Sequence, residues 1–146
     1  DARIRLLASR TGTLSVEIGA LPVAPDKAWR VAVVPLPVDS GDFRLRHKTT
    51  DRAFYDAARK SAGGDEVLFT DQQGQITEGS FTCLFVERDG QLLTPPLARG
   101  LLPSILRREL LESGRAIEAD LTVEDLNEGF FLGNSLRGLI PARRVA

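Results

Sequence analysis

Apolar and polar residues alternate in several short runs of this chain, and the alternation predicts a fold rich in β-strands. The runs 4–8 and 14–18 are separated by Thr11-Gly12, a pattern that is typical of a β-hairpin. The segment 29–36 is continuously apolar and rich in β-branched residues, which predicts a buried strand. Further strands are predicted at 66–70, 81–87, 91–94 and 117–121.

Helices are predicted between these strands. One is expected over 51–62, with Asp51 as its N-cap and Gly63-Gly64 as its end. Another is expected over 103–113, because proline suits the first position of a helix. A short helix is predicted at 122–125. Since helices and strands do not alternate regularly, we expect an α+β fold.

The composition is that of an ordinary globular protein. The chain has 146 residues, of which 42% are hydrophobic and 27% are charged, enough for one domain with its own core. No apolar run approaches the ~20 residues that span a bilayer, so no membrane segment is expected. The formal net charge of -1 gives no electrostatic reason to expect nucleic acid as a partner.

Single copies of two residue types exclude several kinds of site. Cys83 is the only cysteine and His47 the only histidine, so an internal disulfide, a cysteine-cluster metal site and a histidine-rich zinc site are excluded. We therefore expect no metal and a reducing, cytoplasmic location. The chain starts at Asp1 and contains no methionine, so we expect a piece of a longer protein.

Lys48 is the first candidate for chemistry. If the segment 43–48 is extended, Arg44, Arg46 and Lys48 lie on one face of it. Repulsion among three cations favours the free amine that imine formation needs, and the same face attracts anionic ligands. The alternative is an edge strand whose basic residues simply discourage aggregation.

Glu78 is the second candidate. It lies where a turn is expected to lead into the apolar strand at 81–87. A carboxylate at that point could pair with a cation, and a pyridinium nitrogen paired in this way stays protonated and able to accept electrons. The alternative is a glutamate exposed on the turn.

Two further segments are suited to anions. The helix start within 101–107 offers free backbone N–H groups and a helix dipole, although every helix has such an end. The segment 133–138 follows an apolar strand and combines Asn134, Ser135 and Arg137, a set that suits phosphate or carboxylate. A plain turn is the alternative for this second segment.

Five motifs between positions 47 and 141 belong together. They are His47-Lys48-Thr49-Thr50-Asp51-Arg52-Ala53-Phe54-Tyr55, Thr77-Glu78-Gly79-Ser80, Leu93-Thr94-Pro95-Pro96-Leu97, Gly100-Leu101-Leu102-Pro103 and Asn134-Ser135-Leu136-Arg137-Gly138. In their order and spacing they resemble the class IV, or branched-chain-type, family of pyridoxal-phosphate (PLP) enzymes, and within it the aminodeoxychorismate lyases, especially those fused behind component I of para-aminobenzoate synthase.

The resemblance implies a role for each matching residue of the cofactor site. Lys48 matches the Schiff-base lysine, and Glu78 matches the acid that faces the pyridine nitrogen. The backbone N–H groups of Ile105 and Leu106 match the phosphate cradle at the helix start. Ser135, with Asn134 beside it, matches the second phosphate loop.

The resemblance also implies an activity. A lyase of this kind releases pyruvate from 4-amino-4-deoxychorismate and leaves para-aminobenzoate, a folate precursor. Arg137 and Arg46 would then contact substrate carboxylates. The alternatives are a class IV aminotransferase for D- or branched-chain amino acids, and a non-catalytic fragment of a synthase.

The implied architecture is the β-rich large domain of the fold-type-IV PLP enzymes, with helices inserted between the strands of a barrel-like sheet. Residues 1–146 would be this cofactor-holding domain, the C-terminal part of a longer protein. That protein would be a homodimer and would also contain the small N-terminal domain and a fused synthase component. The sequence departs from the family at Cys83, where asparagine is usual, and at Ser104, where glycine is usual.

Overall fold

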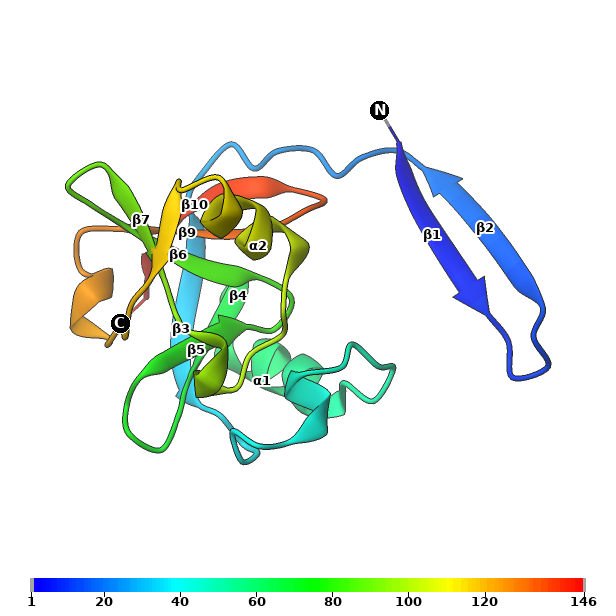
Figure 1. The fold of residues 1–146 in the computed structure, drawn as a ribbon, viewed down its shortest axis with the longest axis horizontal. Coiled ribbons are helices and arrows are strands. Elements are labelled where there is room, and N and C mark those ends of the chain that lie inside the picture. The colour runs from blue at the N-terminus through cyan, green and yellow to red at the C-terminus, as the bar shows by residue number, and fades with distance from the viewer. Residues whose placement is uncertain (1, 146) are drawn as a thin grey trace.

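Ten strands form two separate sheets in the computed structural model, which describes residues 2–145. The first sheet is the expected hairpin of β1 (Arg3–Ala8) and β2 (Leu14–Gly19), which stands away from the rest of the molecule (Figure 1). The remaining strands form one eight-stranded sheet. They are β3 (Trp29–Pro35), β4 (Glu66–Thr70), β5 (Ile76–Gly79), β6 (Cys83–Arg88), β7 (Gln91–Thr94), β8 (Ala116–Glu118), β9 (Phe130–Asn134) and β10 (Gly138–Arg144).

The large sheet is mixed and curled. Its strand order is β5-β4-β3-β10-β9-β6-β7-β8, with β3 parallel to both of its neighbours and β9 antiparallel to both of its own. The backbone N–H of Ile76 on edge strand β5 donates to the carbonyl of Leu121, just beyond β8 at the other edge, at 2.7 Å. This bond brings the two edges together, so the predicted α+β class with a barrel-like sheet is confirmed.

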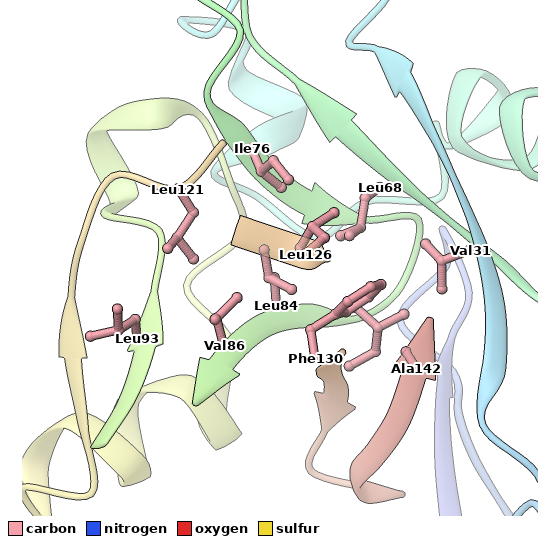
Figure 2. Close-up of a cluster of buried hydrophobic side chains, with 11 residues drawn as sticks. Val31, Leu68, Ile76, Leu84, Val86, Leu93, Leu121, Leu126, Phe130 and Ala142 are labelled. Carbon is pink, nitrogen blue, oxygen red and sulfur yellow. The ribbon is translucent and has the colours of Figure 1, made fainter. Parts of the chain in front are cut away.

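The side chains of the sheet alternate between an inner core and two outer ones, as the pleat requires. On β6, Leu84 and Val86 point into the inner core, which Figure 2 shows together with Phe130 from β9. Cys83 and Phe85 point to the opposite face. Burial on both faces explains why these strands are apolar runs rather than clean alternations.

Two helices cover the outer faces of the sheet. Helix α1 (Ala53–Ala62) packs Tyr55 against Phe69 of β4, and it ends at Gly63, which takes the left-handed conformation as expected. Helix α2 (Ile105–Glu112) packs Leu110 against Cys83 and its neighbours. Three short 3₁₀ helices complete the described chain: η1 (Phe43–Leu45), η2 (Leu97–Arg99) and η3 (Glu124–Leu126).

The prediction of an extended segment at 43–48 is wrong, because residues 43–45 form the 3₁₀ helix η1. The Asp42 side chain accepts a hydrogen bond from the Arg44 backbone N–H at 2.9 Å and also binds the Arg44 guanidinium at 2.7 Å. This local bonding caps a 3₁₀ turn, and it competes with a strand for the same backbone groups. Arg44 therefore does not share a strand face with Lys48.

Both long helices begin later than expected. Helix α1 begins at Ala53, and the Asp51 side chain contacts Arg44 at 3.4 Å instead of capping the helix. Helix α2 begins at Ile105 because Ser104 is its N-cap, with the hydroxyl accepting from Arg107 N–H at 3.5 Å. Strands β5 and β10 were not predicted.

Two classes of feature are not found among residues 2–145. No helix there has the length and apolar character that a membrane span requires. No set of three or more His, Cys, Asp or Glu side chains in the same residues is grouped so that it could hold a metal ion.

Candidate functional site

A pocket of about 500 Å³ brings together residues from four distant segments of the chain. Six of the eight predicted site residues line it: Arg46, Lys48, Glu78, Ile105, Asn134 and Ser135. Its walls are largely apolar, with contributions from Phe81, Leu102, Pro103 and Leu136. Two predicted residues, Leu106 and Arg137, are not part of the lining.

Glu78 is buried in this pocket wall rather than exposed on a turn, because it belongs to strand β5. Its Oε1 accepts a hydrogen bond from the Tyr55 hydroxyl at 2.5 Å, and its Oε2 accepts from the backbone N–H of Leu102 at 3.1 Å. Burial raises the pKa of the carboxyl to about 7, while the two hydrogen bonds and the positive charges of Arg52 and Lys48 act in the opposite direction. The site therefore holds a carboxyl that titrates near neutral pH.

Lys48 lies between η1 and α1, where its side chain is solvent-exposed and lines the pocket. The cations that line the same pocket are Arg46 and Arg52. The explanation that placed Lys48 on a strand face with Arg44 is wrong, although Arg46 and Arg52 line the same pocket as the amine. The pocket is consequently positive at its open side and carries one buried acid.

The start of helix α2 forms another wall. Ile105 lines the pocket, and its N–H and that of Leu106 lie in the first turn, where an α-helix leaves N–H groups without intrahelical partners. The side chain of Leu106 packs instead into the outer core beneath α2. An anion at this helix start would meet backbone donors and the positive end of the helix dipole.

The loop after β9 is organised by Asn134. Its side-chain amide donates to the carbonyl of Phe81 at 3.2 Å, and its Oδ1 accepts from the N–H groups of Leu136 and Arg137 at 3.1 and 3.0 Å. Because all of these bonds are internal to the protein, Asn134 shapes the loop that presents Ser135 to the pocket.

Arg137 points elsewhere. Its guanidinium lies over the indole ring of Trp29, 5.7 Å from the ring centroid, which is a cation–π geometry. Trp29 in turn packs edge-on against Phe81, with ring centroids 5.9 Å apart, and Phe81 lines the pocket. Arg137 is thus one layer of aromatic side chains away from the lining.

Two residues of this site were missed by sequence reasoning. Arg52 lines the pocket, donates to the backbone carbonyl of Ser80 and lies over the ring of Tyr55 at 4.9 Å. Tyr55 reaches Glu78 from α1. The available signal was the three-residue spacing of Arg52 and Tyr55 within the expected helix 51–62, because residues three apart on a helix share a face; in the structure Arg52 is the residue just before α1.

The two departures from the family pattern leave the pocket intact. Cys83 lines it from β6, and burial raises the pKa of the thiol to about 11, so the group is neutral at physiological pH. Ser104 also lines the pocket and uses its hydroxyl to cap α2. Neither residue adds a charge that would repel an anionic ligand.

The donor set fits pyridoxal phosphate. Glu78 supplies a buried carboxylate for a protonated ring nitrogen, Lys48 supplies an amine, and the first turn of α2 supplies donors for a phosphate. The apolar walls suit the faces of an aromatic ring.

Known proteins resemble this chain over most of its length. A "Putative aminodeoxychorismate lyase" from Schizosaccharomyces pombe is 29% identical over 147 residues, covering 93% of this chain and 64% of the relative. A "Probable branched-chain-amino-acid aminotransferase" from Thermotoga maritima is 31% identical over 87 residues, 55% of this chain and 32% of the relative. The chain therefore spans about one third to two thirds of the length of these relatives.

Solved structures share the fold. The crystal structure of a "Putative amino-acid aminotransferase" from Mesorhizobium loti superposes with a TM-score of 0.88 at 43% identity, covering 99% of this chain and 73% of that chain. A hypothetical aminotransferase from Mycobacterium tuberculosis, solved in a PLP-bound form, superposes with a TM-score of 0.81 at 24% identity, covering 97% of this chain and 60% of that chain.

The family model described as "Amino-transferase class IV" matches residues 1–145. This match covers nearly the whole chain, and it agrees with the curled sheet. Enzymes of this family use PLP. The chain belongs to the class IV aminotransferase family.

Proposed function

We propose that this chain is the cofactor-holding part of a PLP-dependent lyase that converts 4-amino-4-deoxychorismate into para-aminobenzoate and pyruvate. The observation that carries the proposal is the single pocket that contains the Lys48 amine, the buried Glu78 carboxyl and the start of α2. These groups come from distant parts of the sequence, and together they match the chemical groups of the cofactor.

Each protein group has a separate task in this proposal. The first-turn N–H groups of α2 and the Ser135 loop hold the phosphate. Glu78 stabilises positive charge on the ring nitrogen, and bound PLP then supplies an electron-accepting ring next to the substrate. Lys48 Nζ takes up the proton that leaves the substrate carbon bearing the amino group. Loss of that proton and departure of pyruvate leave an aromatic product.

The positive side of the pocket supports an anionic substrate. Arg46 and Arg52 line it next to Lys48, and guanidinium groups bind carboxylates through paired hydrogen bonds. The substrate of the proposed lyase carries carboxylates, whereas a neutral amine would gain nothing from this wall. Arg137, held over Trp29, is proposed to act at the outer rim.

The runner-up is an aminotransferase acting on D- or branched-chain amino acids. The 43% identity to the protein from Mesorhizobium loti, whose name is that of an aminotransferase, favours it. The match to the lyase-named relative over 93% of the chain supports the lyase. Both activities use the same cofactor groups, so the products discriminate them: pyruvate with an aromatic amine, or a keto acid with an aminated acceptor.

Replacement of Lys48 by alanine in the complete protein tests the assignment of the amine. We expect Lys48→Ala to abolish both the long-wavelength absorbance of bound PLP and the release of pyruvate. Lys60→Ala is the matched control, because Lys60 is exposed on α1 and does not line the pocket. Turnover that survives in Lys48→Ala would contradict the assignment.

A second substitution tests the role of Arg137. We expect Arg137→Ala to weaken the binding of substrate more than the binding of PLP, measured as KM and as the PLP dissociation constant. Equal losses of both would place Arg137 in the phosphate site instead. Arg143→Ala, which changes an exposed arginine on β10 outside the pocket, is the control.

A further inference from the structure

The hydroxyl of Tyr55 and the carboxyl of Glu78 form a buried pair behind the pocket. The hydroxyl donates to Oε1 at 2.5 Å, and the two residues are 1% and 3% exposed. Tyr55 itself does not line the pocket, whereas Glu78 does. Tyr55 can therefore influence a bound ligand only through its neighbours in the lining, Glu78 by a hydrogen bond and Arg52 by ring contact.

The ring of Tyr55 is held on several sides. It packs edge-on against Phe69 of β4 and against Phe54, with ring centroids 5.5 and 4.1 Å away, and the Arg52 guanidinium lies 4.9 Å over it. Contacts on several sides restrict the rotamers that the ring can adopt. Tyr55 lies on α1 and Glu78 on β5, so their hydrogen bond joins the helix to the strand behind the pocket.

The charge distribution makes Tyr55 a donor rather than an acid. Burial, and then the negative charge of Glu78, raise the pKa of the phenol far above its ordinary value, so it stays protonated. Its hydrogen bond lowers the pKa of Glu78 against the opposing effect of burial. The other groups that favour the ionised form are the Leu102 N–H and the charges of Arg52 and Lys48.

We propose that Tyr55 is a positioning residue of this site, whose phenol fixes the Glu78 carboxylate toward the pocket and keeps its negative charge available to a protonated ring nitrogen. The ligand part of this inference rests on the proposed PLP function. The contact between the Tyr55 and Glu78 side chains does not depend on PLP, so an experiment can refute the role of Tyr55 without refuting the proposed function, and the reverse.

A graded change of the donor tests this role without depending on turnover. Tyr55 is the only tyrosine of the chain, so biosynthetic 3-fluorotyrosine modifies this one position. The titration of Glu78 is followed by carbon NMR of glutamate-labelled, ligand-free protein, with the resonance assigned through Glu78→Gln. Three proteins are compared: wild type, Tyr55→Phe and the 3-fluorotyrosine form.

We expect the Glu78 midpoint to rise in Tyr55→Phe by about one to two pH units, because a hydrogen bond to a charged group is lost. It should fall in the 3-fluorotyrosine form, because a more acidic phenol is a stronger donor. A residue that merely fills space would not produce this order. If Tyr55→Phe fails to fold, the near-isosteric 3-fluorotyrosine protein still tests the proposal. An unchanged or raised midpoint of the Glu78 titration in that protein would overturn it.

The affinity for PLP provides the second measurement. At pH 8 we expect Tyr55→Phe to bind PLP several-fold more weakly than wild type, and Thr94→Val to match wild type. Thr94 is a control because its buried hydroxyl has no hydrogen-bond partner among the described residues and lies outside the pocket. Absent PLP binding by wild type would refute the proposed function alone, whereas equal PLP affinity of wild type and Tyr55→Phe would refute the role of Tyr55.

Discussion

Glu66 Oε1 accepts a hydrogen bond from the Ser80 hydroxyl at 2.5 Å, and both residues are buried. The same carboxylate accepts from the N–H of Ser80 at 3.2 Å, from the N–H of Phe81 at 3.3 Å and from the Thr82 hydroxyl at 3.2 Å. One side chain on β4 thus holds the whole turn between β5 and β6. Because Phe81 and Thr82 line the pocket, Glu66 shapes the site without touching its contents.

Replacement of Glu66 by glutamine should destabilise the protein. The amide keeps one acceptor oxygen but turns N–H groups toward the donors of the Ser80 turn, so buried donors lose their partner. We expect a loss of about 2 kcal/mol in the free energy of unfolding, measured in urea. Glu87→Gln, at an exposed position on β6, should change it by less than about 0.5 kcal/mol. Equal unfolding midpoints for the two variants would refute this role.

The buried carboxyl of Glu78 should make stability depend on pH. Its pKa is about 7 in the folded protein against an ordinary value of 4.5, so between these values the folded state holds a proton that the unfolded state has released. Stability therefore falls as pH rises through this window, by on the order of 3 kcal/mol, and is flat above it. Urea unfolding at pH 5 and pH 7.5 measures the difference.

The control variant is Glu78→Gln. Its amide cannot titrate, so the dependence of the free energy of unfolding on pH in this window should disappear. A carboxyl whose pKa is lowered in the folded protein has the opposite effect: its contribution to stability is lost as pH falls, and this happens at lower pH. A hydrogen bond from Arg99 lowers the pKa of Asp120, so the stability that Asp120 contributes is lost only as pH falls below the ordinary aspartate value of 3.8. A wild-type slope that persists in Glu78→Gln would show that another group causes it.

Gly100 should not tolerate a side chain. It has φ +83°, and a Cβ at this position would lie 2.8 Å from the backbone oxygen of Ser40. Gly74 has a similar φ of +78° but open space around it. We expect Gly74→Ala to cost about 1 kcal/mol from backbone strain, and Gly100→Ala about 3 kcal/mol because the backbone clash adds to that strain. Equal losses of stability in the two variants, measured by thermal or urea unfolding, would show that the backbone at Ser40 moves to make room for the methyl group.

The thiol of Cys83 should be almost inert in the folded protein. Burial raises its pKa from 9.0 to about 11, so the thiolate fraction at pH 8 is lowered about a hundredfold. We expect a disulfide reagent to modify Cys83 only as fast as the protein opens, and urea to accelerate the reaction sharply. Rapid modification of the native protein would indicate that this wall of the pocket is mobile.

The β1–β2 hairpin should be the least protected part of the chain in hydrogen exchange. Its apolar side chains are exposed, among them Ile4 at 69% and Ile18 at 75%, and an isolated two-stranded hairpin is marginally stable in water. We expect its amides to exchange orders of magnitude faster than those of β4 and β6 in this chain. Comparable protection would mean that another surface covers the hairpin in solution.

The sequence by itself determined the elements whose signals are local. Alternation marked the hairpin and the apolar runs marked β3, β4 and β7, because burial on a sheet face imposes its period directly on the residues. Gly63 marked the end of α1 for an equally local reason, the left-handed backbone conformation. The ordered motifs around Lys48 and Glu78 indicated the class IV family, and the motifs together with the segments beside them named six of the residues that line the pocket.

The tertiary structure decided what depends on residues distant in the sequence. Strands β5 and β10 went unpredicted because they are defined by their neighbours in the sheet rather than by an alternation of their own. The Asp42–Arg44 contact turned the expected strand before Lys48 into a 3₁₀ helix. Packing of α1 and of the Leu102 backbone against β5 buries Glu78, and that burial, a property of packing rather than of residue type, raises the pKa of the acid to about 7.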